Sequence, residues 1–351
     1  MPSYSDIIKN NREVSAVKWW PNFAYHFTDV MNAAGILSSG VLYSRTEAVR
    51  NNRMVNNNAS TQVINITDNA VRSSVRFYFR PLTPTQYYNE GYKHKELRFD
   101  SADKDGSIGA NVPIPVFLTF RLNELLNEDR IMFSEFSQAG HGAQLYKGPE
   151  DFSRLDFEKI YSNGPADDET RKYRHAELII PERYFIDRSL YRILCRNDFE
   201  CDTLRNLLLE QNPSAYNKCK DKIVVYNEKN EIFYNNGLYV AGIDVCGNSL
   251  RIRFVDNYNR IKYTDNMIQK RQITAPLEKL CMKIELSWKD ANGNYILSQT
   301  YFANVDYINP KNILVSGIDY IQEARTIMVR LSIDEAIVGY AEICLSGDEL
   351  V

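Results

Sequence analysis

Short segments with alternating apolar and polar residues follow one another through the last third of the chain. LRIRF (250–254) and MKIELSW (282–288) alternate with period two, which is typical of half-buried strands. Turn-forming clusters such as EKNE, CGN, DNYN and DANGN separate the segments. The pattern predicts strands at residues 222–227, 231–235, 238–245, 250–256, 282–288, 295–303, 326–332 and 336–345. Many short strands at this spacing indicate a β-sandwich or a small barrel.

Before residue 215 the pattern is mixed, with strand-like and helix-like segments between long polar loops. Asp29 and Gly40 stand where the N-cap and the C-cap of a helix over residues 30–39 would be. We expect strands at residues 24–27, 73–79, 115–120, 176–180 and 191–196, and a helix at 121–127. NPSAYNKC interrupts the helical run DTLRNLLLEQ, so we place a linker within residues 211–220. The expected fold is an α+β domain over residues 1–214, followed by a β-rich, sandwich-like domain of unknown role over residues 215–351.

The length of the chain agrees with two folded domains, since 351 residues exceed the usual size of a single domain. The chain has 42 Lys and Arg against 45 Asp and Glu, a net charge of −3, which excludes a basic coat over the whole surface but not a local basic groove. Tyrosine is abundant, with 23 Tyr and 16 Phe against 3 Trp. Tyrosine rings offer flat faces with a polar tip, which suits the stacking of a planar ligand.

Cysteine and histidine usage predicts no metal site. The six cysteines form no C-x-x-C pair and there are four histidines, whereas a zinc site needs closely spaced ligands. The N-terminal segment carries charges and no apolar core of a signal peptide, and no apolar run approaches about 20 residues. We therefore expect a cytoplasmic protein without a membrane partner.

The first candidate site is YHFTD (25–29), at the end of a predicted strand. His26 and Thr28 are two positions apart, so both side chains point to one face of the strand. Such a pair can form hydrogen bonds with a carboxamide or a ribose. The alternative is that His26 is a core histidine whose hydrogen bonds are satisfied within the protein.

The second candidate is VRFYFRPLTPTQYYNEGYK (75–93). Phe77 and Phe79 point to one face of an extended segment and Tyr78 to the other. Aromatic rings beside Arg76, Arg80 and Lys93 suit a ligand that is both flat and anionic. A core strand followed by a solvated loop would have the same pattern.

The third candidate is TRKYRHAELIIPERYF (170–185), in which a basic run leads to Glu177 at the start of an apolar strand. A charged side chain in that position is costly unless it is paired or used. In the alternative interpretation, Glu177 lies on a strand edge and the basic run is an ordinary solvated surface.

In this order, YHFTDVMNAAGIL, FYFRPLTPTQY and RHAELIIP resemble the DarT family of bacterial toxins, which are DNA-targeting mono-ADP-ribosyltransferases related to PARP-like enzymes. The resemblance covers roughly residues 18–200. It implies a split β-sheet core with helices, NAD consumed as a substrate, single-stranded DNA as the target, no metal, and a cognate antitoxin with ADP-ribosyl-hydrolase activity as a partner.

The resemblance also implies roles for individual residues. Glu177 matches the catalytic glutamate of the family. The residues that would bind NAD are His26, Thr28, Asn32, Tyr43, Ser44, Arg45, Tyr78 and Tyr87. The residues that would contact DNA are Arg80, Arg171, Lys172, Tyr173, Arg174 and His175.

The loop between YHFTD (25–29) and the aromatic segment that begins at residue 75 differs from the family pattern, which has a functional arginine in this loop. The loop reads RNNRMVNNNASTQVINITDNAVR, and none of Arg50, Arg53 and Arg72 aligns cleanly. Asn58 and Thr67 fall nearer to the expected place. We assign the catalytic arginine to Arg53, and the difference leaves open whether thymine or guanine is the modified base.

The chemistry explains these residue types. Breaking the bond between nicotinamide and ribose builds positive charge on the ribose, which a fixed carboxylate stabilises, and the same carboxylate can accept a proton from the attacking base. The sequence therefore predicts NAD-dependent ADP-ribosylation of a base in single-stranded DNA, used as a toxin or an anti-phage effector. The alternatives are transfer to RNA or protein, or a non-catalytic scaffold, and the intact His26 and Glu177 argue against the scaffold.

Overall fold

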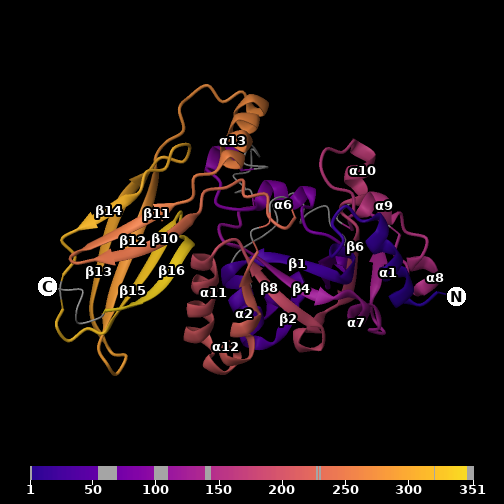
Figure 1. Ribbon diagram of the computed structural model, residues 1–351, viewed down its shortest axis with the longest axis horizontal. Coiled ribbons are helices and arrows are strands. Elements are labelled where there is room, and N and C mark those ends of the chain that lie inside the picture. The colour runs from indigo at the N-terminus through magenta and orange to yellow at the C-terminus, as the bar shows by residue number, and fades with distance from the viewer. Residues whose placement is uncertain are drawn as a thin grey trace.

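The computed structural model describes residues 2–53, 69–98, 110–138, 144–226, 228, 231–319 and 321–345. Its N-terminal part is built on a seven-stranded sheet with the order β5-β6-β3-β1-β4-β8-β9 (Figure 1). The strands are β5 Met132–Ser134, β6 Glu177–Pro181, β3 Ser74–Tyr78, β1 Phe23–Asp29, β4 Pro115–Arg121, β8 Leu190–Cys195 and β9 Ile223–Val225. Neighbouring strands are antiparallel except for β8 and β9, which are parallel. A two-stranded sheet of β2 (Val41–Tyr43) and β7 (Arg183–Phe185) accompanies it.

Local sequence explains the centre of this sheet. The first six residues of β4, PVFLTF, are buried, as expected for a strand that is covered on both faces. β1 leads directly into α2 (Val30–Ser39), where the Asp29 carboxylate accepts a hydrogen bond from the backbone N–H of Met31 at 3.0 Å. The helix ends at Gly40, whose φ of 70° favours glycine. Both predicted caps are confirmed.

Helices surround the sheet. In Figure 1, α2, α11 and α12 lie between the sheet and the C-terminal part, and α1 and α8 lie at the opposite end. The helices of this part are α1 Tyr4–Val14, α2, α3 Arg45–Arg50, α5 Asn69–Arg72, α6 Pro84–Asn89, α7 Leu122–Leu126, α8 Pro149–Phe152, α9 Phe157–Ile160, α10 Asp168–Tyr173, α11 Asp198–Gln211 and α12 Pro213–Cys219. The short 3-10 helices are η1 Trp20–Asn22, η2 Lys95–Leu97, η3 Ile186–Arg188 and η4 Lys220–Lys222.

The C-terminal part is a sandwich of two antiparallel sheets. One has the order β10-β11-β14, with β10 Val240–Cys246, β11 Ser249–Phe254 and β14 Ile313–Ser316. The other has the order β13-β12-β15-β16, with β13 Tyr295–Val305, β12 Leu280–Lys289, β15 Thr326–Ile333 and β16 Ala336–Cys344. Leu250 and Ile252 of the first sheet share one core with Met282, Ile284 and Leu286 of the second. The predicted α+β class and the sandwich-like C-terminal part are confirmed.

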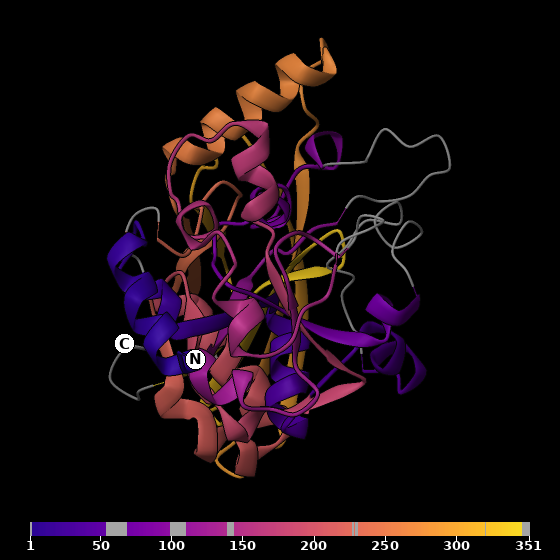
Figure 2. The same cartoon turned by 90° about the vertical axis from the view of Figure 1, so that its right-hand side faces the viewer.

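Three local predictions differ from the structure. Residues 231–235 form no strand, and the predicted linker at 211–220 is largely the helix α12. The helix α13 (Tyr258–Arg271) was not predicted, because its buried face combines Tyr263 and Met267 with the polar Arg260 and Thr264 and lacks a clear apolar stripe. α13, drawn in orange, lies along the top of the molecule in both views (Figure 1 and Figure 2).

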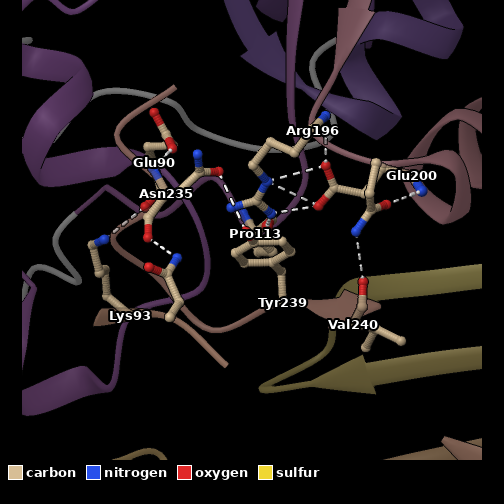
Figure 3. A network of polar contacts seen from close by, with 10 residues as sticks. Glu90, Lys93, Pro113, Arg196, Glu200, Asn235, Tyr239 and Val240 are labelled. Carbon is tan, nitrogen blue, oxygen red and sulfur yellow. Dashed lines mark hydrogen bonds and ion pairs between the residues drawn. The ribbon is translucent and has the colours of Figure 1, made fainter. Parts of the chain in front are cut away.

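A buried polar network joins the two parts of the chain (Figure 3). The Glu90 carboxylate accepts hydrogen bonds from the backbone N–H groups of Tyr234 at 2.9 Å and Asn235 at 2.7 Å. The Lys93 ammonium donates to the carbonyl and the side-chain oxygen of Asn236, both at 2.6 Å, and lies 4.2 Å from the ring centroid of Tyr263 on α13. Burial raises the pKa of Glu90 and lowers that of Lys93. Buried charges of this kind are costly unless they are satisfied, so these contacts specify how the segment before β10 docks on the N-terminal part.

Arg196 and Glu200 form a second part of this junction (Figure 3). The Arg196 guanidinium donates to Glu200 and to the carbonyl of Pro113, and it lies 3.9 Å from the ring centroid of Tyr239. Farther along α11, Thr203 accepts a hydrogen bond from the backbone N–H of Tyr340 on β16 at 3.1 Å. The helix α11 therefore holds the sandwich through both its first turn and its middle.

The division between the parts is best drawn from strand pairing. β9 pairs with β8 in the N-terminal sheet from Ile223 to Val225, which lies beyond the expected boundary at residue 214. We propose that the division falls after Val225, with residues 231–239 forming the shared junction.

No helix in the described part of the chain combines the length and the apolar character needed to cross a membrane.

Two glycines at the junction give a test of its packing. A Cβ on Gly237 would lie 2.6 Å from the carbonyl carbon of Gly91, so the two backbones touch. We expect Gly237→Ala to lower the free energy of unfolding by about 1–3 kcal/mol, measured by urea denaturation. Gly35→Ala on α2 is the matched control, because nothing lies within 4 Å of the added methyl group, and it should be neutral or stabilise by up to about 1 kcal/mol. Equal effects of the two substitutions would contradict the close approach.

Candidate active site

Glu177 is the first residue of β6, and its side chain has no exposed surface. Because β6 lies between β5 and β3, Glu177 stands opposite Ser134 on one side and Tyr78 on the other. Arg76 is two residues from Tyr78 on β3 and therefore lies on the same face of the sheet as Glu177. Arg76 Nε donates to Glu177 Oε2 at 2.7 Å, and Arg76 Nη2 donates to Oε1. The result is a two-pronged ion pair between adjacent strands.

This ion pair is open to solvent only on the arginine side, since 26% of the Arg76 side chain is exposed. Burial alone would lower the pKa of Arg76, but the negative charge of Glu177 raises it above its ordinary value, so the guanidinium stays charged. A carboxylate has about four lone-pair sites, and Arg76 occupies one on each oxygen. Each Glu177 oxygen can therefore accept one further hydrogen bond.

His26 is fixed against the same strand. Its Nδ1 lies 3.0 Å from the carbonyl oxygen of Arg76, and because a carbonyl only accepts, Nδ1 carries the proton. Burial lowers the pKa of His26, and the nearby Arg76 charge lowers it further against the opposing effect of the backbone hydrogen bond. The ring is thus neutral at pH 7, and Nε2 is left as an acceptor.

The other predicted NAD-binding residues before the aromatic block lie on four consecutive elements. Thr28 is buried on β1, and Asn32 is buried in the first turn of α2. Tyr43 ends β2, and the Ser44 hydroxyl accepts a hydrogen bond from the backbone N–H of Glu47 and so caps α3. Arg45 begins α3.

Two of the cations near these elements lie close to each other. Burial lowers the pKa of Arg45, and the charge of Arg72 lowers it further. Like charges in proximity favour an anion between or beside them.

The two predicted tyrosines are separated. Tyr78 lies directly beside Glu177 in the sheet, and burial raises its pKa. Tyr87 lies on α6, where its ring contacts Tyr88, Tyr234 and Tyr263 at centroid distances of 5.2–5.3 Å. The structure thus groups Tyr78, and not Tyr87, with the carboxylate.

Arg80 is a correction to the predicted DNA contacts. Only 1% of the residue is exposed, its guanidinium lies 4.5 Å from the ring centroid of Trp20, and it donates to the carbonyls of Pro81 and Ser162. Burial and the nearby Arg174 charge lower the pKa of Arg80 to about 9. A side chain enclosed in this way cannot reach a phosphate, so Arg80 is a core residue.

The basic run before Glu177 begins in the last turn of the helix α10 and continues into the turn that follows Tyr173. Arg174 is 9% exposed and donates to Ser162 Oγ at 3.1 Å and to the Gly164 carbonyl at 2.8 Å, so it braces the segment before α10. Arg171 is exposed and forms an ion pair with Asp168 at 2.8 Å. Arg174 therefore has a structural task that the sequence did not indicate.

Three other residues of the run remain accessible to a ligand to different degrees. Lys172 is exposed, and Tyr173 is half-buried with its ring against Phe136 at 4.9 Å. His175 is half-buried beside Glu177, and burial lowers its pKa despite the opposing carboxylate charge.

The arginine that sequence reasoning missed is Arg76. Arg53, which was assigned the catalytic role, is exposed just after α3, and its backbone N–H donates to the Ala48 carbonyl at 2.8 Å. Asn58 and Thr67 lie outside the described residues. Arg76 could have been found from the alternation of VRFYF, which places Arg76 and Tyr78 on one face, if the pairing of this strand with the Glu177 strand had been known.

Within the described ranges, no group of three or more His, Cys, Asp or Glu side chains is placed to hold a metal ion.

Comparisons with known proteins agree with the sequence resemblance. Residues 25–234 match a family model described as DarT, ssDNA thymidine ADP-ribosyltransferase. Solved structures with partial similarity include Thermus sp. 2.9 DarT in complex with ADP-ribosylated ssDNA, at 17% identity over 59% of this chain and 95% of that chain, with a TM-score of 0.47. The same protein in complex with NAD+ gives 19% identity over 59% and 96%, with a TM-score of 0.44.

A further similar structure is Thermosipho africanus DarTG in complex with ADP-ribose, at 14% identity over 53% of this chain and 47% of that chain, with a TM-score of 0.41. A comparison with curated proteins gave no match. The family assignment therefore depends on the family model, which covers more than half of the chain.

The ion pair predicts a coupling that can be measured by unfolding. Arg76→Met leaves the buried Glu177 carboxylate without its partner and should lower the free energy of unfolding by about 2–4 kcal/mol. Adding Glu177→Gln to Arg76→Met should restore part of this loss, giving a coupling energy above about 1 kcal/mol in a double-mutant cycle. Additive effects would show that the two side chains do not act as a pair.

Proposed function

The chain belongs to the DarT family of single-stranded DNA thymidine ADP-ribosyltransferases, and we propose that it transfers ADP-ribose from NAD to a thymine base with Glu177 as the catalytic carboxylate. The observation that carries this proposal is the buried ion pair of Glu177 with Arg76, beside a neutral His26, within the residues matched by the family. The family description favours thymine over guanine, and DNA over RNA or protein.

In this reaction the bond between nicotinamide and the ribose breaks, its electron pair leaves with nicotinamide, and positive charge develops on the ribose. The Glu177 carboxylate, held in one orientation by Arg76, stabilises that charge with its free lone pairs. The base nitrogen then forms the new bond to the ribose and gives up its proton, for which Glu177 is the available acceptor. Because Arg76 fixes the orientation of the carboxylate through two hydrogen bonds, we assign a positioning role to Arg76 in place of the catalytic role predicted for Arg53.

His26 and the elements after it support NAD binding. The Nε2 acceptor of His26 suits a ribose hydroxyl donor, and Thr28 and Asn32 follow it on the same strand and the next helix. Tyr43, Ser44 and Arg45 are proposed to line the same cleft, and the like charges of Arg45 and Arg72 suit the diphosphate of the cofactor. Tyr78 stands opposite Glu177 in the sheet, and its ring suits stacking on the nicotinamide.

The DNA strand is proposed to approach from α10, which leads directly into β6. Lys172 offers an exposed charge for a phosphate, and Tyr173 and His175 offer rings for a base. Arg171 can bind a phosphate only in competition with its ion pair to Asp168. Arg80 is buried and is not among the proposed DNA contacts.

The biological setting is proposed on family grounds alone. An enzyme that modifies bases in single-stranded DNA fits a cytoplasmic toxin or anti-phage effector, and a partner antitoxin with ADP-ribosyl-hydrolase activity would reverse the modification.

Substitution of the carboxylate tests the function directly. Glu177→Gln keeps the shape and one acceptor for Arg76 but removes the charge, so transfer should fall about 10²–10³-fold or more while the protein stays folded. The measurement is incorporation from labelled NAD into separate pools of single-stranded DNA, duplex DNA, RNA and protein, with Asn127→Asp on the exposed surface as a charge-altering control. Wild-type turnover in the Gln variant would remove Glu177 from the mechanism, and labelling of another pool would redirect the substrate assignment.

His26 should affect the donor side of the reaction. His26→Ala removes the hydrogen-bond acceptor for a ribose hydroxyl of NAD. Because the ribose is then misplaced, the rate should fall about 10²-fold, chiefly in the constants measured with NAD as the varied substrate. Since the pKa of His26 lies below the usual value of about 6.5, the wild-type rate should be insensitive to this group at neutral pH and should decline only as protonation turns Nε2 into a donor at lower pH. An unchanged KM for NAD and an unchanged rate in the variant would make His26 a core histidine only.

A further inference from the structure

A pocket lined by charged side chains and one tyrosine lies apart from Glu177, on the other side of the seven-stranded sheet's centre. It has a volume of about 360 Å³ and is lined by Arg121 at the end of β4, by residues 187–192, and by Asp221 and Lys222 of η4. Four cationic and two acidic side chains line it, and two of the cations, Arg121 and Arg188, form ion pairs with Glu124 and Glu128. A cavity of this size matches a small ligand or one nucleotide of a strand.

An irregularity in the sheet presents Tyr191 to this pocket. β4 and β8 are paired at Thr119 with Arg192 and then at Phe120 with Leu190, so Tyr191 is the extra residue of a β-bulge. Bulges re-aim a side chain away from the regular alternation of the strand. Tyr191 is 38% exposed.

The Tyr191 ring forms a flat platform with its neighbours. Phe23 stacks on it at a centroid distance of 4.8 Å and an interplanar angle of 23°. The guanidinium carbons of Arg121 and Arg192 lie 5.2 Å and 5.5 Å from its centroid. Unstacked bases bind on aromatic rings and on guanidinium planes of this kind.

Two of the cations are held by neutral acceptors. Arg192 Nη1 donates to the Asp221 carbonyl at 3.0 Å, and Lys222 Nζ donates to the Leu190 carbonyl at 2.8 Å. Carbonyls fix these side chains without cancelling their charge. Arg188, by contrast, is neutralised by both carboxylate oxygens of Glu128 at 2.9 Å and 2.8 Å. Arg192 and Lys222 are therefore a positioned pair of charges beside a stacking platform.

The sheet register relates this pocket to the candidate active site. Glu177, Tyr78, Tyr25, Thr119 and Arg192 stand opposite one another in successive pairs across β6, β3, β1, β4 and β8. Four steps of about 4.8 Å separate Arg192 from Glu177 along the sheet by about 19 Å. At about 3.4 Å per stacked nucleotide, this span corresponds to roughly five or six nucleotides.

We propose that this pocket binds a nucleotide unit, with its phosphate on Arg192 and Lys222 and its base on the Tyr191 platform. The unit belongs to the substrate strand, roughly five or six nucleotides from the modified base, so that the pocket anchors the flank of the DNA. The assignment to the substrate strand rests on the proposed function. A free nucleotide carries the same phosphate and base and could fill the same pocket.

Binding of labelled oligodeoxynucleotides by fluorescence anisotropy tests the proposal without depending on transfer. For a single strand of about 16 nucleotides with one central thymidine, Arg192→Gln with Lys222→Gln should reduce the log–log salt slope by about 1.4, since each phosphate contact contributes ~0.7. Tyr191→Ala should weaken binding about tenfold, and Tyr191→Phe should not, because it keeps the ring. For a strand of about four nucleotides, which cannot span the sheet, the variants should bind like the wild type.

The matched control is Lys279→Gln with Lys311→Gln, which removes the same charge from exposed positions of the C-terminal part. Binding of thymidine monophosphate to the wild type but not to the Arg192 and Lys222 variant would support the pocket and assign it to free nucleotides. If the Arg192 and Lys222 variant has the same salt slope for the long strand as the wild type, the proposal is overturned. The proposal also fails if this variant loses binding to poly-glutamate while its DNA binding is unchanged, because that result would indicate an acidic protein partner.

Transfer to the long strand is measured in parallel. If the wild type transfers no ADP-ribose to it, the proposed function fails, while the anisotropy result still decides whether the pocket binds DNA.

Discussion

The ion pair between Arg76 and Glu177 is the interaction on which the candidate active site depends. A carboxylate without exposed surface is stable only if a cation and the surrounding hydrogen bonds compensate for the lost water, and here the cation comes from the adjacent strand. The carbonyl of the same arginine fixes the tautomer of His26. One residue of β3 thus sets the orientation of the carboxylate on β6 and of the imidazole on β1, and the three strands must pair in this register for the site to exist.

The C-terminal sandwich is joined to this scaffold by buried polar contacts and not by an apolar surface alone. Glu90, Lys93 and Arg196 are all buried at the junction. Glu90 and Lys93 bind backbone groups of the segment that leads to β10, and Arg196 binds the carbonyl of Pro113 just before β4. Contacts that must be satisfied all together favour one docking geometry over many, which is the usual contribution of buried polar networks. Through Lys93 the same network reaches Tyr263, so α13 is placed by residues of both parts.

Features that depend on neighbouring residues could be predicted from the sequence, and features that depend on distant pairing could not. Asp29 and Gly40 cap α2 as expected because capping is decided within one turn. The partner of Glu177 lies 101 residues away and became visible only with the pairing of β3 and β6. Arg80 and Arg174 have the appearance of nucleic-acid contacts in the sequence, yet packing against Trp20 and bonding to Gly164 turn both inward. The helix α13 was missed because tertiary contacts bury its polar residues Arg260 and Thr264.

The central claim is that Glu177, held by Arg76, faces the ribose from which nicotinamide departs. A crystal structure with an NAD analogue whose nicotinamide bond cannot break, and with a thymidine-containing oligonucleotide, measures this directly. The account predicts a Glu177 oxygen within about 3.2 Å of a hydroxyl of that ribose, with Arg76 still bound to the carboxylate and His26 Nε2 on the same sugar. A nicotinamide ribose bound elsewhere, with Glu177 still covered only by protein, would contradict it.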